Sequence, residues 1–294
     1  MAASQDQGFI IEDGPKGRTL TVTGPWSSRA EEALYRPDVV RLALNYTAGF
    51  SGDLEFLDAW PISRLHILDR SLVDLDPVTR LGETLEELDI QTAPDVQIDL
   101  GALSRLRRLS THWDNISETL SYASGLEHLE VWHFDGEDIA DLDLEAPLTR
   151  LKLVDTPNLL SVDGIEAFSD LTFFFVALAR ELDDLDAIPA VADNLKELEI
   201  ETCLGVTAID ALGALENLRF LGVSDCGRID SLSPLANLTE LEVLYAWGST
   251  RVLDGDLTPL LKLPRLREIR MRDRREYKPR IRDIPSSTLF AGGD

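Results

Sequence analysis

The sequence of 294 residues is short of basic side chains and of cysteine. It has 28 Lys and Arg against 53 Asp and Glu, a formal net charge of −25. A surface of this sign repels polyanions, so the balance disfavours nucleic acid or an anionic membrane as partner and favours a basic protein or a cationic ligand. The same charge also serves solubility. Two cysteines are too few for a four-cysteine zinc centre.

Long apolar runs are also absent. The longest, residues 171–179, is interrupted at Thr172 and is far shorter than the roughly 20 residues that a membrane helix needs. Residues 1–11 lack the basic stretch and apolar core of a secretory signal. We therefore expect a cytoplasmic protein without a membrane span. No phosphate-binding glycine loop occurs, and we expect no cofactor.

What the sequence does contain is an internal repeat of 20–25 residues. The pattern is LxxLxLxx followed by a small or polar residue. Its clearest units read LKELEIETCLGVTAIDALGALEN from Leu195 and LRFLGVSDCGRIDSLSPLANLTE from Leu218. The eleven first positions are Val39, Ile62, Leu85, Leu106, Leu126, Leu148, Leu171, Leu195, Leu218, Leu241 and Leu266.

These units resemble bacterial leucine-rich repeats of the internalin type, over roughly residues 39–275. The LxL pair occupies alternate residues of a short strand and points inward, while the residues around it point outward. After the strand, apolar residues recur every three positions, as at Val206, Ile209 and Leu212, which suits 3-10 turns better than an α-helix. The predicted fold is an α/β solenoid, a leucine-rich-repeat arc with a parallel β-sheet on the concave face and mostly 3-10 or irregular turns on the convex face.

The ninth position of the motif departs from the family, which usually has Asn or Cys there. Both cysteines, Cys203 and Cys226, fall in this column, so we expect two buried, reduced thiols. An asparagine ladder is absent. The column reads Thr47, Arg70, Ala93, Asp114, Phe134, Thr156, Ala179, Cys203, Cys226, Ser249 and Arg274.

Both ends of a solenoid need a cap. We predict an N-terminal cap over residues 1–38, with a hairpin of residues 9–11 and 18–23 and a short helix that starts at a capping box from Ser28 to Glu31. The solenoid follows over 39–275, and 276–294 form a C-terminal cap or tail, loose from residue 286. Residues 262–282 hold ten basic and three acidic side chains, which indicates either a patch for an acidic partner or a solvated last coil.

The outward strand positions define the predicted concave surface. They include all four histidines and eight of the twenty aromatic residues, with Tyr46 and His66 near the first coils. Aromatic rings surrounded by charge are typical of binding surfaces, although rings that pack on one another and merely cover the sheet are the alternative. The candidate binding residues are His112, Trp113, His128, Trp132, His133, Phe173, Phe175, Glu199, Phe220, Tyr245 and Trp247.

Two catalytic alternatives fit the residues less well. His66, Asp89 and Ser110 share one row, but a nucleophilic triad needs the histidine between the serine and the acid. A zinc site from His112, His128 and His133 with Glu130 lacks a compact tetrahedral arrangement. We therefore predict no catalytic residue and no metal.

The sequence thus predicts a module that binds a protein or peptide through an aromatic and histidine-rich concave face, and the net charge favours a basic partner. One alternative is an acidic inhibitor or immunity-type protein that covers a basic enzyme. Another is a metal-dependent hydrolase that uses the histidine cluster.

Overall fold

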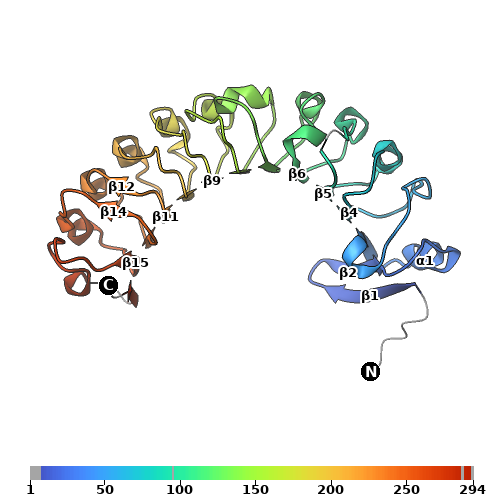
Figure 1. Ribbon diagram of the computed structural model, residues 1–294, viewed down its shortest axis with the longest axis horizontal. Helices are drawn as coiled ribbons and strands as arrows, with labels where there is room; N and C mark the ends of the chain where they lie inside the picture. Colours follow the sequence, from blue (N-terminus) through green and yellow to red (C-terminus); the bar gives the residue numbers. More distant parts are fainter. Residues whose placement is uncertain (1–7, 95, 286–287, 293–294) are drawn as a thin grey trace. The chain divides into compact units, whose positions relative to one another are not determined.

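The computed structural model describes residues 8–94, 96–285 and 288–292. The chain divides into two compact units. The first comprises the described residues of Met1–Val131 with Leu144–Ala146, and the second those of Trp132–Asp143 with Pro147–Asp294. Within each unit a short strand alternates with a 3-10 turn, coil after coil (Figure 1).

The first unit opens with an antiparallel hairpin, in which Phe9 pairs with Val22, and continues with parallel strands. Its last strand, β7, ends at the boundary between the units. The elements are β1 (Phe9–Gly14), β2 (Gly17–Val22), α1 (Ser28–Leu34), β3 (Val39–Asn45), η1 (Tyr46–Ala48), β4 (Arg64–Leu68), η2 (Asp76–Leu81), β5 (Glu87–Gln91), η3 (Leu100–Ala102), β6 (Arg108–His112), η4 (Trp113–Asn115), η5 (Leu120–Tyr122) and β7 (His128–Trp132).

The second unit is a parallel sheet in the order β8-β9-β10-β11-β13-β15-β16, with β12 and β14 paired separately. In Figure 1 its strands lie on the inner side of its curve and its 3-10 turns on the outer side. The elements are η6 (Ile139–Leu142), β8 (Arg150–Val154), η7 (Ile165–Ala167), β9 (Phe173–Ala177), η8 (Ile188–Val191), β10 (Glu197–Glu201), η9 (Asp210–Ala214), β11 (Phe220–Ser224), β12 (Arg228–Ile229), η10 (Ser233–Asn237), β13 (Val243–Ala246), β14 (Arg251–Val252), η11 (Thr258–Lys262), β15 (Glu268–Arg272), η12 (Ile281–Asp283) and β16 (Thr288–Gly292).

The repeat places the core as predicted. Each of the eleven motif units carries one of the parallel strands β3 to β11, β13 and β15 among the described residues. The inward pair of each strand is buried, as with Leu198 and Ile200 on β10 and with Leu221 and Val223 on β11. The prediction of a solenoid with a parallel sheet and 3-10 turns is therefore confirmed.

The ends of the predicted segments need correction. The helix α1 is capped by Ser27, whose hydroxyl accepts from the Ala30 amide at 3.3 Å, one residue before the predicted capping position. At the other end the chain is not loose throughout, because residues 288–292 form β16 and pair in parallel with β15. An added strand satisfies the backbone groups that β15 would otherwise expose at its edge.

The turn column is shifted by one residue in some coils. The buried side chain in the fourth coil is Asn115 rather than Asp114, and its amide donates to the Val96 carbonyl at 2.7 Å. In the tenth coil it is Thr250 rather than Ser249, and its hydroxyl donates to the Val223 carbonyl at 2.7 Å. A buried polar side chain is retained here because it satisfies turn carbonyls that no strand can pair.

Five left-handed residues of the second unit follow the strands β7 to β11 in turn. Each lies at the eighth position of its motif unit, and its N–H donates to a carbonyl at the end of the next strand, at 2.9–3.1 Å. These residues are His133, Asp155, Leu178, Thr202 and Asp225, with φ of 55–60°. Leu178 stands out because a leucine at positive φ places its Cβ close to backbone oxygen.

Replacing Leu178 with glycine is expected to stabilise the protein by about 0.5–1 kcal/mol, because glycine relieves the left-handed strain. Little burial is lost, since the side chain is already 39% exposed. Leu160, 45% exposed and without positive φ, is the matched control. Its change to glycine is expected to destabilise by about 0.5–1 kcal/mol. Urea unfolding of both variants measures the difference, and a destabilised Leu178→Gly would contradict the strain.

Candidate binding surface on the second unit

The central outward row of the second unit runs across six neighbouring strands. The strand register places one residue from each strand side by side along this row. In order from β8 to β15 the row reads Lys152, Phe175, Glu199, Gly222, Tyr245 and Arg270.

Basic side chains lie over the aromatic rings at both ends of this row. The Lys152 Nζ is 5.3 Å from the centre of the Phe175 ring, and the Arg270 Cζ is 4.4 Å from the centre of the Tyr245 ring. Both distances are in the range of favourable cation–π contacts. The middle of the row is left to a carboxylate, Glu199, and to a residue without a side chain, Gly222.

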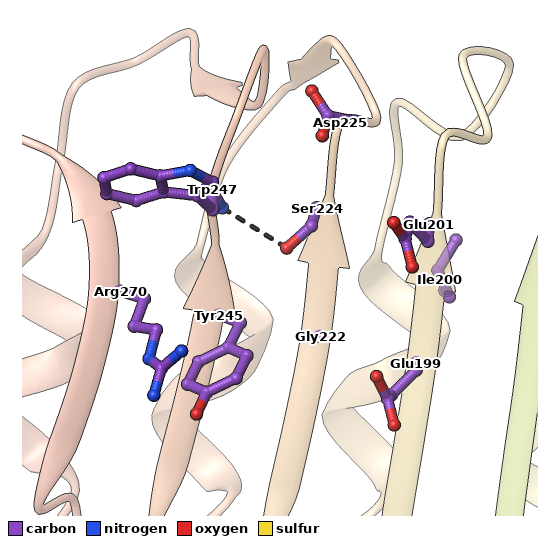
Figure 2. A pocket seen from close by; sticks show the side chains of 9 residues that line it. All are labelled: Glu199, Ile200, Glu201, Gly222, Ser224, Asp225, Tyr245, Trp247 and Arg270. Atoms are coloured by element: carbon purple, nitrogen blue, oxygen red, sulfur yellow. Dashed lines mark hydrogen bonds between the residues drawn. The ribbon is translucent and has the colours of Figure 1, made fainter. Parts of the chain in front are cut away.

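A hollow of about 410 Å³ opens over Gly222. Figure 2 shows it as a groove along the strand that carries Gly222 and Ser224. Glu199 and Glu201 lie on one side of the groove, and Tyr245 and Trp247 lie on the other. A Cβ added at Gly222 would lie 3.4 Å from the Phe220 ring and 3.5 Å from the Glu199 Cγ, which is ordinary contact. The residues that line this Gly222 hollow are Glu199, Ile200, Glu201, Gly222, Ser224, Asp225, Tyr245, Trp247 and Arg270.

The aromatic wall is held in place by its neighbours. The Tyr245 hydroxyl donates to the Glu268 carboxylate at 2.8 Å, and the Phe220 ring meets the Tyr245 ring edge-on at 4.9 Å. Arg270 donates to the same carboxylate at 2.8 Å. Burial, and then the hydrogen bond to Glu268, raise the pKa of Tyr245, while that bond is the main cause that lowers the pKa of Glu268. The ring is therefore a preformed, neutral surface.

Trp247 extends this wall at the end of β13. It is 39% exposed, and its backbone N–H donates to the Ser224 hydroxyl at 3.4 Å. The next turn is fixed by Asp225, whose carboxylate accepts from the Ser249 amide at 2.8 Å. The backbone of Trp247 is thus anchored, while much of the surface of its ring is exposed to solvent.

The acidic wall is electrostatically strained. Burial raises the pKa of Glu199, and the flanking carboxylates of Glu197 and Glu201 raise it further, while Lys152 and Arg150 oppose the shift. The charged form of this half-buried carboxyl is thus disfavoured by lost hydration and by like charges on its own strand. A positive group placed in the hollow would relieve both effects.

The structure gathers several predicted binding residues around the Gly222 hollow. Glu199, Tyr245 and Trp247 line it. Phe175 is the strand neighbour of Glu199, and Phe220 packs on Tyr245. The sequence reasoning missed Gly222 itself, although it is the only glycine at the fifth motif position in the eleven units.

Two of the predicted aromatic residues are not exposed, and this corrects the sequence reasoning. Trp113 is only 8% exposed, because the chain leaves the strand there and Trp113 begins the turn η4. Phe173 is 5% exposed, because the Arg150 guanidinium lies 3.7 Å from its ring centre. Neither ring is available as a surface anchor.

The histidine-rich candidates do not share one compact unit. His112 and His128, both half-buried, belong to the first unit, whereas Trp132 and His133 belong to the second. The His133 Nδ1 lies 2.8 Å from the Asp155 carboxylate of the next strand. Their role in binding stays a prediction.

The arrangement of the described residues supports neither of the two catalytic alternatives. The register places Asp89 between His66 and Ser110, and His66 Nδ1 lies 2.8 Å from Asp89. Among the residues that the structure describes, no group of three or more His, Cys, Asp or Glu could hold a metal ion. Within the same described ranges, no helix has the length and apolar character to cross a bilayer.

Comparison with solved structures shows the fold. An internalin of Listeria monocytogenes aligns over 79% of this chain and 68% of its own, with 17% identity and a TM-score of 0.59. The chain has the leucine-rich-repeat fold. Internalin C2 of the same species covers 71% of this chain and 82% of its own at 20% identity, with a TM-score of 0.44. A leucine-rich-repeat protein of Leptospira interrogans covers 86% and 72% at 16% identity, with a TM-score of 0.47.

No known family model matches the sequence, and no curated protein is significantly similar to it. The solved leucine-rich-repeat structures therefore relate this chain to others by architecture alone.

Proposed function

We propose that this leucine-rich-repeat protein binds a protein or peptide non-covalently, through the strand face of its second unit. The observation that carries the proposal is the Gly222 hollow, a recess in an otherwise filled row. Interface anchors are enriched in Trp and Tyr that insert beside desolvated recesses, and Tyr245 and Trp247 form one wall here. A partner that inserts a side chain would gain contact with both rings without moving the sheet.

The acidic-inhibitor alternative is one form of this proposal. The net charge of −25 and the carboxylates of Glu199, Glu201 and Asp225 in the hollow favour a basic partner. We propose no catalytic role, because the described lining of the hollow contains neither histidine nor cysteine that could activate the Ser224 hydroxyl, and the Tyr245 hydroxyl is held by Glu268.

The test is a selection of peptides from a displayed random library against the purified protein. Trp247→Ala is expected to weaken the selected peptides by about 30-fold, the loss of a typical aromatic anchor. Tyr122→Ala is the matched control, since Tyr122 is an exposed aromatic on a 3-10 turn of the first unit. Peptides that bind Trp247→Ala as tightly as the unchanged protein would refute the proposed surface.

A further inference from the structure

We infer, on the basis of the proposed function, that the Gly222 hollow receives an arginine or lysine side chain of the partner. The shape of the hollow is the first reason. Gly222 contributes no side chain to the floor, while Glu199 and Tyr245 stand on the neighbouring strands at either side. Figure 2 shows the resulting groove, which continues past Ser224 to Glu201 and Trp247. A long, slender side chain fits a groove of this form.

The charge of the hollow is the second reason. Three carboxylates line it, from Glu199, Glu201 and Asp225. The ion pairs of the β13 to β15 region engage other carboxylates, such as those of Glu242 and Glu268. Arg270, the one basic residue of the lining, is held by Glu268 on the far side of Tyr245. The lining thus holds three carboxylates against one guanidinium, which Glu268 already engages.

The chemistry of the surrounding face is the third reason. Three basic side chains of the chain already lie over aromatic rings on this sheet, at 3.7 Å, 5.3 Å and 4.4 Å from the ring centres. The pairs are Arg150 with Phe173, Lys152 with Phe175 and Arg270 with Tyr245. Beside the pair of Arg270 and Tyr245, the hollow offers three carboxylates and the exposed ring of Trp247. An incoming cation would repeat the pattern, with its aliphatic stem over Gly222.

The strained carboxyl of Glu199 supports this inference. Its pKa is raised by burial first and then by the charges of Glu197 and Glu201. The ionised form of Glu199 is therefore disfavoured in the protein without a partner. A bound cation would lower that pKa and favour ionisation. Neutralising Glu199 should consequently help the free protein and harm the complex, a trade-off that purely structural residues do not show.

The experiment uses the peptides selected from the displayed library, resynthesised in pairs. In one member of each pair the basic residue is replaced by its neutral counterpart, citrulline for arginine or norleucine for lysine. We expect the selected peptides to share a basic residue at one position, and its neutral counterpart to bind about 10- to 100-fold more weakly. Isothermal titration of each pair measures the ratio.

Two variants of the protein locate the effect. Gly222→Leu fills the hollow at constant charge, so the two members of a pair should bind it equally weakly. Glu199→Gln removes the charge at constant shape, so it should lose affinity for the basic peptide while its melting temperature does not fall. Glu216→Gln, an exposed acid of the outer turn, is the charge-matched control and should change neither. Gly222→Ala, whose methyl fits at ordinary contact, gives a milder version if the leucine variant does not fold.

The outcomes separate the two proposals. Neutral peptides that bind as tightly as their basic parents would overturn the inference, while a loss on Trp247→Ala would still uphold the proposed function. If neither Trp247→Ala nor the Gly222 variants changed the peptide affinities, both the proposed function and the inference would be overturned.

Discussion

Replacing Trp113 with alanine is expected to lower the free energy of unfolding by about 3–5 kcal/mol, the cost of truncating a core tryptophan. The ring is 8% exposed, and the Trp113 carbonyl accepts from the amides of Ile116 and Ser117 at 2.9 Å, which closes the turn. The same change at Trp247, 39% exposed, is expected to cost only about 1–2 kcal/mol, because much of that ring is already in water.

Urea unfolding followed by circular dichroism measures both variants. Leu129→Ala is the core control, because Leu129 is a buried inward residue of β7, and about 2–5 kcal/mol is expected for it. If Trp113→Ala unfolded like Trp247→Ala, the ring of Trp113 would not belong to the core. The comparison also tests whether the ring of a tryptophan directly after a strand is exposed or is buried by the turn that follows.

The thiols of Cys203 and Cys226 are expected to react with iodoacetamide at least about 100-fold more slowly in the native protein than in denaturant. Both side chains are buried, and burial raises their pKa from 9.0 to about 11 and about 12. Near pH 8 only about one thiol in a thousand or fewer is then ionised, against about one in ten for an unperturbed group. The Cys226 Sγ also lies 3.3 Å from the Ile200 carbonyl, in contact with the preceding coil.

The pH dependence has a definite sign. Because the folded pKa values lie above that of the unfolded thiol, the contribution of the thiols to stability is present below about pH 9. It is lost as the pH rises through about 11 and about 12. Mass spectrometry should find two alkylated cysteines per chain after unfolding and none in the native protein after the same time. Rapid labelling of either thiol in the native state at pH 8 would contradict the burial.

The strands were predictable from the sequence because their signal is repeated and strictly periodic. A shift of one residue would turn Leu198 and Ile200 to solvent, so the inward pair fixes the register of β10 and of its neighbours. The turns carry no such constraint. Asn115 takes the buried turn position in place of Asp114, because the 3-10 turn η4 begins directly after β6, where the following coils have a left-handed residue.

The candidate site was predictable only where side chains mark it. Tyr245 and Trp247 could be found because outward strand positions have no packing need for large rings. The prediction for Phe173 was wrong because the long side chain of Arg150, on the preceding strand β8, reaches over its ring. Gly222 was missed for the opposite reason, since a recess is defined by the neighbours of an absent side chain, and these become known only with the register.

The Gly222 hollow is a vacancy in a regular surface, and this has an evolutionary consequence. The core beneath it is made by Leu221 and Val223, which point the other way. Natural variants with a bulkier residue at position 222 are expected to fold and to lose affinity for the partner. Recognition could therefore be lost in evolution without a loss of stability. Conversely, exchanging the residues at positions 199 and 222 would move the recess by one strand, about 4.8 Å, and with it the spacing of the ligand groups that the surface accepts.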